Sequence, residues 1–279
     1  MIVRELWSHR DDEDLAVFLG ACREGELASA LYAIEGVPEP AIAEDEATFG
    51  GWARGVTSLL AVRGASPIEQ ARALATVLGE QGGFQGDADD YYNPANSLLH
   101  QVVERRRGMP ILLSIVWMEV GRRARVPVSG VGLPGHFLVR VGRLGGILAD
   151  PFAGGALISV AECRRKVEEI SGGSIAWRPE FLRDSSTDQI LERVLQNLAG
   201  AFKRDEDEVG RYRAATFLSA LRPDSAQRLW ERAELANELG VRELAERSYV
   251  EIVERFPETS EAQQAAERLG EEVEPPTLN

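Results

Sequence analysis

The sequence predicts an α+β body followed by an all-helical region, and three observations carry this prediction. Apolar residues recur at helical spacing through most of the first 125 residues, and short strand-like segments follow Arg125. Helical spacing then returns from about residue 185. A buried helix followed by an antiparallel meander is an α+β arrangement. The 279 residues, 44% of them hydrophobic, suffice for a substantial core in one large or two modest domains.

Residues 1–64 form a predicted N-terminal helical segment. Acidic residues from Asp11 to Asp14 supply capping groups and negative charge at a helix start. Apolar residues then follow helical spacing as far as Ile34, and the segment Gly36-Val-Pro-Glu-Pro40 interrupts the pattern. We expect a second helix over about residues 45–62.

Residues 65–184 form the predicted core, which opens with three helices. Ser66-Pro67-Ile68-Glu69 combines a capping serine, a first-turn proline and the glutamate of a capping box. Asn93-Pro94 begins the next helix, which ends at Gly108. Pro110 opens a third helix that is apolar on nearly every side, so we expect it to be buried centrally.

Three short strands are predicted after these helices, over residues 126–133, 136–141 and 146–152. The glycine-rich segment 142–146 provides the turn between the last two. His136 begins the second strand and Asp150 lies near the end of the third, so an antiparallel pairing can bring the two side chains together. A histidine oriented by an aspartate is the base half of a nucleophilic triad.

These segments resemble the transglutaminase-like core, whose architecture is that of the papain-like proteases. The resemblance is closest to the bacterial SirB-type proteins that carry a tetratricopeptide tail, and it covers about residues 65–270. The segments that carry it are Gly83-Phe84-Gln-Gly86, Asp90-Tyr91-Tyr92-Asn93-Pro94-Ala-Asn96-Ser97, Arg106-Arg107-Gly108-Met-Pro110-Ile and Leu133-Pro-Gly-His-Phe137.

The resemblance assigns roles to three positions. His136 matches the family's base and Asp150 matches the residue that orients it, but the nucleophilic cysteine's position falls on Pro110. Cys22 and Cys163 lie outside the motif and cannot replace it. A thiolate mechanism needs sulfur at the helix N-terminus, where the dipole lowers the thiol pKa, so thiol chemistry is not expected.

Ser114 is the alternative nucleophile. It lies one turn after Pro110 on the same helix face, so it could approach His136 and complete a Ser–His–Asp hydrolase or acyltransferase. A serine inside the helix, however, lacks the free backbone N–H groups of the first turn and commonly bonds back to the preceding turn. Three readings stay open: a purely structural His136–Asp150 pair, a peptide-binding cleft, and catalysis.

Residues 185–272 form the predicted tetratricopeptide-like region, and residues 273–279 a disordered acidic tail. Ala245, Tyr249, Ile252 and Pro257 stand at relative spacings of 0, 4, 7 and 12, which fits the second helix of such a repeat. An ordinary helical hairpin is the alternative. Helical repeats of this type present concave surfaces to partner proteins.

The bulk composition excludes several classes of function. A formal net charge of -14 repels the nucleic-acid backbone, and we expect no nucleic-acid partner. The uncharged apolar runs are too short to span a bilayer, and the N-terminus lacks a signal-peptide pattern, so we expect a cytoplasmic protein. The three histidines are scattered and no phosphate-binding loop occurs, so we expect neither metal nor cofactor.

The sequence thus predicts a regulatory pseudoenzyme that binds a protein or peptide partner without catalysis. In the candidate cleft, His136 and Asp150 persist as vestigial or binding residues. Its other expected binding residues are Tyr91, Tyr92, Asn96, Ser97 and Pro110. The tetratricopeptide-like tail is the other candidate surface.

Overall fold

The computed structural model describes residues 7–143 and 145–271; the tail expected over 273–279 lies outside this range. The chain forms two compact units. The core unit comprises residues 25–194, and the helical unit comprises the described residues up to Glu24 and from Leu195 onward. These units divide the chain at other points than the expected boundaries at residues 64 and 184, which stay a prediction.

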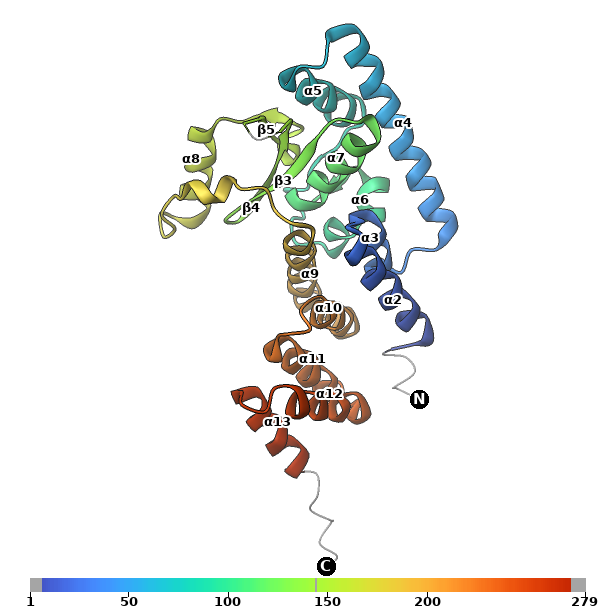
Figure 1. The fold of residues 1–279 in the computed structure, drawn as a ribbon, viewed down its shortest axis with the longest axis vertical. Coiled ribbons are helices and arrows are strands. Elements are labelled where there is room, and N and C mark those ends of the chain that lie inside the picture. The colour runs from blue at the N-terminus through green and yellow to red at the C-terminus, as the bar shows by residue number, and fades with distance from the viewer. Residues whose placement is uncertain (1–6, 144, 272–279) are drawn as a thin grey trace, which may run out of the picture. The chain divides into compact units, whose positions relative to one another are not determined.

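The core unit begins with a series of helical segments, the last of which is central to it. They are α3 (Leu27–Glu35), α4 (Glu39–Arg63), α5 (Pro67–Leu74), a π-helical segment η1 (Ala75–Gln81), the 3₁₀ segment η2 (Pro94–Ser97), α6 (Leu99–Arg105) and α7 (Pro110–Ala124). Figure 1 shows α4 running along the outer side of α7. The expected cap is present, because Ser66 Oγ accepts from the Glu69 backbone N–H at 3.4 Å.

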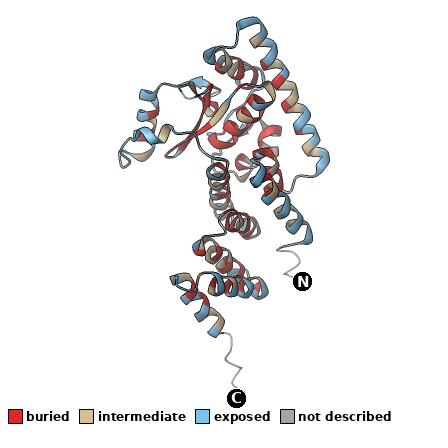
Figure 2. Ribbon diagram, in the orientation of Figure 1, coloured by how far each residue is buried: buried red, intermediate tan, exposed pale blue. Residues whose placement is uncertain are grey.

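Helix α7 is the centre of the core, as its apolar sequence predicts. Proline occupies its first position, and nearly every side chain from Pro110 to Val120 is buried. Figure 2 shows this burial along the helix. Strands β3 and β4 pack on α7. A Cβ atom at Gly121 would lie 2.5 Å from Val128 Cγ2, so the small residue permits the close approach of α7 to β3.

The main sheet has four antiparallel strands in the order β3-β4-β5-β6. Their bounds are β3 (Val128–Leu133), β4 (His136–Val141), β5 (Ile147–Asp150) and β6 (Ala156–Leu157). Leu133 pairs with His136 across the first hairpin, and Val141 pairs with Ile147 across the second. A separate two-stranded parallel ladder joins β1 (Gln85–Gly86) to β2 (Arg107–Gly108).

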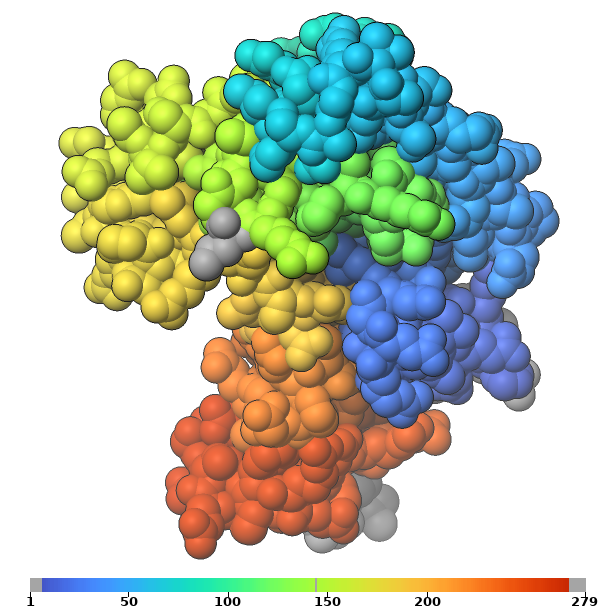
Figure 3. Space-filling view, turned by 45° about the horizontal axis from the view of Figure 1, so that its top comes forward, coloured from blue at the N-terminus to red at the C-terminus, as the bar shows by residue number. Residues whose placement is uncertain are grey.

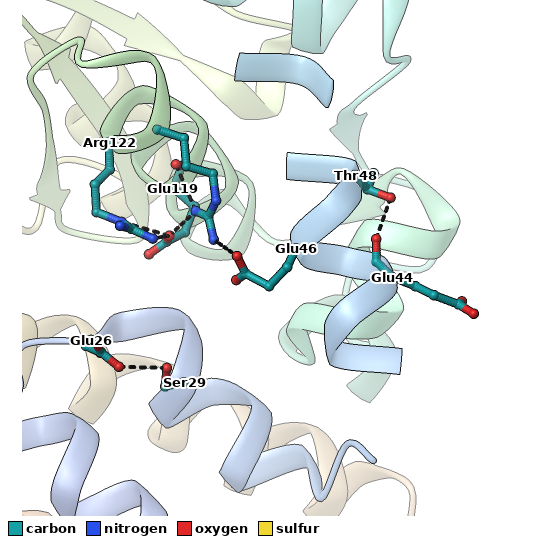
Figure 4. Close-up of polar contacts among 8 residues, drawn as sticks. Glu26, Ser29, Glu44, Glu46, Thr48, Glu119 and Arg122 are labelled. Atoms are coloured by element: carbon teal, nitrogen blue, oxygen red, sulfur yellow. Dashed lines mark hydrogen bonds and ion pairs between the residues drawn. The ribbon is translucent and has the colours of Figure 1, made fainter. Parts of the chain in front are cut away.

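Charged residues tie α7 to α4. Arg123 of α7 pairs with Glu46 of α4 and with Glu119 of its own helix. Figure 4 shows Glu46 reaching from α4 toward Glu119, which also binds Arg122 at 3.1 Å. A carboxylate on each side compensates the partly buried guanidinium of Arg123.

The chain after β5 covers the outer face of the sheet. It forms the 3₁₀ segment η3 (Pro151–Ala153), α8 (Val160–Ser171) and the 3₁₀ segment η4 (Pro179–Leu182). Cys163 and Val167 of α8 pack against Val131, Leu133 and Leu138 of the sheet. Figure 3 shows the segment from α8 to η4 as a lobe on the surface of the core. Helix α9 (Thr187–Arg204) follows and contributes residues to both units.

The helical unit has a core of its own. It contains α2 (His9–Glu24), α10 (Glu208–Leu221), α11 (Ala226–Glu238), α12 (Arg242–Arg255) and α13 (Ser260–Glu271). Ala245, Tyr249 and Ile252 of α12 are buried against α11 and α13, which agrees with the helical spacing found in the sequence. The expected α+β class with a helical C-terminal region is confirmed, whereas the tetratricopeptide assignment stays a prediction.

Candidate functional site

His136 is positioned by the tight turn that joins β3 to β4. Pro134 and Gly135 form the two-residue loop, and Gly135 has a φ of +70°, which glycine adopts without strain. A Cβ atom at Gly135 would also lie 2.4 Å from Ile170 Cγ2 of α8. The turn therefore fixes His136 at the first position of β4, where the residue is 6% exposed.

Asp150 is the last residue of β5 and lies against His136. Asp150 Oδ1 accepts from the Phe152 backbone N–H at 3.1 Å, which caps η3. His136 Nε2 lies 2.9 Å from Asp150 Oδ2. Both residues are buried, so the contact expected from the two strand ends is present in the interior of the core.

Lys166 of α8 is a third member of this cluster, and the sequence reasoning missed it. Its Nζ lies 3.2 Å from Asp150 Oδ2, the same oxygen that faces His136. Burial alone would raise the Asp150 pKa, but His136 and Lys166 outweigh it and hold the pKa below its usual value. The sequence signal was indirect: Lys166 lies between Cys163 and Val167, which mark the buried face of an amphipathic helix.

The nucleophile position contains no reactive group. Pro110 begins α7 and is buried. Ser114 has no solvent exposure, and its hydroxyl donates to the Pro110 carbonyl oxygen at 2.8 Å. Within the described residues, no hydrogen bond joins Ser114 to His136.

Neither cysteine offers an activated thiol at this site. Cys163 is fully buried, and burial together with the neighbouring Asp150 carboxylate raises its pKa to about 11. A thiol with this pKa stays protonated near neutral pH, so it is a poor nucleophile. Cys22 belongs to the helical unit.

The expected binding residues fall into two groups. The Tyr91 ring meets the Phe152 ring at a centroid distance of 6.0 Å, and Phe152 meets the His136 ring at the same distance. Tyr92 is 54% exposed and lies edge-on to Tyr91. A Cβ atom at Gly86 would lie 2.3 Å from the Phe152 ring, so the glycine permits Phe152 to occupy this place.

Asn96 and Ser97 instead make hydrogen bonds inside the core. Asn96 Nδ2 donates to the Asp90 carbonyl at 2.7 Å, and its Oδ1 accepts from Arg105 at 3.1 Å. The Ser97 hydroxyl lies 2.9 Å from Met109 Sδ. These contacts fix the loop before α6, and a ligand-binding role for the two residues stays a prediction.

A second, partly buried histidine–aspartate pair was also missed. His100 Nδ1 of α6 lies 2.9 Å from Asp45 Oδ2 of α4. The Glu35 carboxylate of α3 accepts from the His100 and Gln101 backbone N–H groups at 2.9 and 3.3 Å. Burial raises the Glu35 pKa to about 7. These residues come from three separate helices, and no short sequence motif predicts that they meet.

The described residues contain no group of three or more His, Cys, Asp or Glu side chains that could hold a metal ion. Among the described helices, none is both long and apolar enough to cross a membrane.

Sequence comparisons place the chain among known proteins. A UPF0162 protein of Xylella fastidiosa strain 9a5c is 34% identical over 197 residues, which are 69% of this chain and 70% of the relative. A UPF0162 protein of Pseudomonas aeruginosa is 30% identical over 213 residues, or 76% of this chain and 77% of the relative. F-box only protein 21 of Mus musculus is 32% identical over 61% of this chain, but the match covers 28% of that protein.

A family model completes the comparison. No solved structure is significantly similar to this chain. The model described as "Transglutaminase-like superfamily" matches residues 46–196, which include α7, the His136–Asp150 pair and Lys166. The chain therefore belongs to the transglutaminase-like superfamily and is a relative of the UPF0162 proteins.

Proposed function

We propose that this chain is a non-catalytic, regulatory member of its superfamily that binds a protein or peptide partner. The observation that carries the proposal is the lack of a nucleophile: proline occupies the position where the resemblance expects cysteine. His136 has an orienting carboxylate in Asp150, but the described residues around the pair supply no activated thiol or hydroxyl. A base without a nucleophile completes only half of a triad.

The geometry of Ser114 favours this proposal over the hydrolase alternative. Its hydroxyl is enclosed and already donates to Pro110. A catalytic serine needs a hydrogen bond to its base and access to substrate, and a buried mid-helix serine has neither. A rearrangement of α7 would therefore have to precede any acyl transfer.

A groove on the helical unit supports partner binding. A cavity of about 450 Å³ opens along α9, α10 and α11, with Leu218 and Trp230 among its lining residues. Lys203 of α9 and Glu238 of α11 also line it, and neither makes an ion pair within the described residues. A groove lined by apolar residues and by unpaired charges of both signs suits a peptide with mixed side chains.

The cytoplasm is the compartment we assign to this function. Within the described residues, Cys22 and Cys163 form no disulfide, which suits a reducing environment. The formal net charge of -14 disfavours nucleic acid as the partner. The resemblance to SirB-type proteins with a tetratricopeptide tail favours a protein as the partner, because such helical repeats commonly bind other proteins.

Two arms test the proposal on the full-length protein. In the first, serine-directed fluorophosphonate and thiol-directed iodoacetamide probes are applied to the wild type and to His136→Ala. We expect no covalent labelling that depends on His136. Labelling of the wild type that disappears in a folded His136→Ala variant would show a working nucleophile and overturn the non-catalytic assignment.

The second arm tests binding through the groove. Partners crosslinked to the wild type are identified by mass spectrometry and compared with those of Lys203→Glu and Glu238→Lys. Glu258→Lys is the matched control, because Glu258 is exposed and does not line the groove. We expect the control to retain the partner and the two groove variants to lose most of it. Equal recovery from all variants would exclude the groove.

A further inference from the structure

A second cavity of the helical unit combines charged side chains with aromatic rings. Its volume is about 380 Å³, at the small end of the range of ligand pockets. Residues from the start of the described chain and from α2, α10, α11 and α12 line it, among them Trp7, Tyr212, Arg232, Glu243 and Arg247. It shares no lining residue with the groove along α9, α10 and α11, so it is a separate candidate site.

Arg232 is held at this cavity by buried hydroxyl groups. Its Nε and Nη2 donate to Ser248 Oγ at 3.3 and 3.1 Å, and its Nη1 donates to Ser219 Oγ at 3.4 Å. Its Nη2 also donates to Glu251 at 3.1 Å. Ser219, Ser248 and the cavity-lining Thr216 are all the buried serines and threonines of this unit among the described residues. Burying polar groups costs free energy, so gathering them at one cavity favours a ligand site there.

Aromatic and aliphatic side chains give the cavity an apolar side. Trp7 Nε1 donates to Asp12 Oδ1 of α2 at 2.8 Å, which fixes the indole ring. The Trp7 ring meets the Tyr212 ring edge-on at a centroid distance of 6.0 Å. Leu15 and Leu244 also line the cavity. One side of the cavity can therefore receive an apolar group.

Glu243 and Arg247 supply charges that the protein itself leaves unpaired. They lie one turn apart on α12, they are exposed, and both line the cavity. A glutamate and an arginine at this spacing often form an ion pair. Within the described residues, however, neither side chain makes an ion pair or a hydrogen bond. One negative and one positive charge thus remain for a ligand.

We propose that this cavity binds a free α-amino acid with an apolar or aromatic side chain. The carboxylate of the ligand pairs with Arg247, and its ammonium group pairs with Glu243. The ligand side chain packs on Trp7 and Tyr212. An α-amino acid has both charged groups on one carbon atom, and protein charges one helical turn apart, about 5 to 6 Å between Cβ atoms, match this short separation. The site adds a small-molecule ligand to the proposed function and does not depend on it.

The test is a nuclear magnetic resonance titration of the full-length ¹⁵N-labelled protein. The reporter is the Trp7 indole N–H signal, which is assigned by its loss in Trp7→Phe. The ligands are L-phenylalanine, N-acetyl-L-phenylalanine, L-phenylalaninamide and L-alanine. We expect phenylalanine to bind at least about tenfold more tightly than the acetyl and amide derivatives, because each derivative leaves one protein charge unpaired. Alanine should also bind more weakly, because it lacks the ring.

Variants of the two charges separate recognition from folding. We expect Glu243→Gln and Arg247→Gln each to weaken phenylalanine at least about tenfold. Glu243→Gln should also bind phenylalanine and its acetyl derivative alike, because the ammonium group has lost its partner. A merely structural role would not change this ratio. Glu254→Gln and Arg242→Gln are the matched controls, because both residues are exposed on α12 and do not line the cavity.

Three results would overturn the site. The first is a Trp7 signal that phenylalanine does not shift. The second is binding of the acetyl or amide derivative as tightly as phenylalanine, which would assign the cavity to one end of a peptide instead. The third is unchanged affinity for phenylalanine in both Glu243→Gln and Arg247→Gln, with the fold intact by circular dichroism.

Discussion

The core unit contains two histidine–aspartate pairs with the same separation and different surroundings, one buried and one partly buried. His136 Nε2 and Asp150 Oδ2 lie 2.9 Å apart, as do His100 Nδ1 and Asp45 Oδ2. Asp150 also binds the ammonium group of Lys166. The His100 pair instead has further acids around it: Glu35 caps the backbone of α6, and Glu104 lies 3.8 Å from His100 Nε2.

The surroundings shift the two aspartates in opposite directions. Burial raises the Asp45 pKa above its usual value despite the His100 hydrogen bond, whereas His136 and Lys166 hold the Asp150 pKa below it. The His136–Asp150 pair thus lies in a field of positive charge, and the His100–Asp45 pair lies in a field of negative charge. A histidine–aspartate distance by itself does not identify a catalytic site, because neighbouring charges decide what the pair can do.

The largest expected difference between the two pairs is in stability. Asp150→Ala leaves His136 and Lys166 without their shared anion and removes the cap of η3, so we expect a loss of about 3 to 5 kcal/mol. Asp45→Ala should cost less, about 1 to 2 kcal/mol, because its acidic neighbours already disfavour the ionised carboxyl. Urea denaturation at neutral pH, followed by circular dichroism, measures both.

Asp89→Ala is the control for this comparison, because Asp89 is an exposed acid of the same unit. The variant should unfold as the wild type does. If Asp45→Ala costs as much as Asp150→Ala, the surrounding charges do not distinguish the two pairs.

The second expected difference is in pH dependence. Folding raises the Glu35 pKa from 4.5 to about 7, so the folded core binds a proton that the unfolded chain releases. The free energy of unfolding therefore falls as pH rises from 4.5 to 7, by up to about 3 kcal/mol. The His100 pKa is also raised: burial lowers it, but Asp45, Glu35 and Glu104 outweigh burial. Its contribution is fully present below pH 6.5 and is lost as pH rises through the folded pKa.

The pKa shifts around the two pairs have opposite signs, so stability at each pair responds to pH in the opposite sense. Asp150 has a depressed pKa, so its stabilising contribution is present above about pH 3.8 and is lost only in acid. We expect the melting temperature of the wild type to fall between about pH 5.5 and pH 8.5. Glu35→Gln keeps an acceptor oxygen for α6 but cannot ionise, so its fall should be clearly smaller. An identical pH profile for Glu35→Gln would contradict the assignment.

Local patterns predicted the elements of this fold, but not every contact between them. The capping box at Ser66 and the opening of α7 at Pro110 are local signals, and both are present. Helix α4 begins at Glu39, earlier than expected, because proline is tolerated in the first helical turn. The π-helical segment Ala75–Gln81 has no local signal of this kind.

In the candidate site, too, local patterns predicted some contacts and not others. His136 and Asp150 were expected to meet because a short hairpin relates the ends of β4 and β5. Lys166 could not be placed without knowing how α8 packs on the sheet. His100 and Asp45 are 55 residues apart in the sequence, and only the packing of α4 against α6 brings them together.

The smallest expected effect concerns Ser114 and separates the two readings of the His136 pair. If that pair is non-catalytic, Ser114→Ala removes only a hydroxyl bonded to its own helix, and stability should change by about 1 kcal/mol or less. Any fluorophosphonate labelling of the protein should also remain unchanged. A hydrolase centred on Ser114 predicts the opposite, because labelling would vanish in both Ser114→Ala and His136→Ala while the fold persists. Because the volume change is small and alanine favours the helix, we expect Ser114→Ala to fold as the wild type does, so this variant tests the hydroxyl itself.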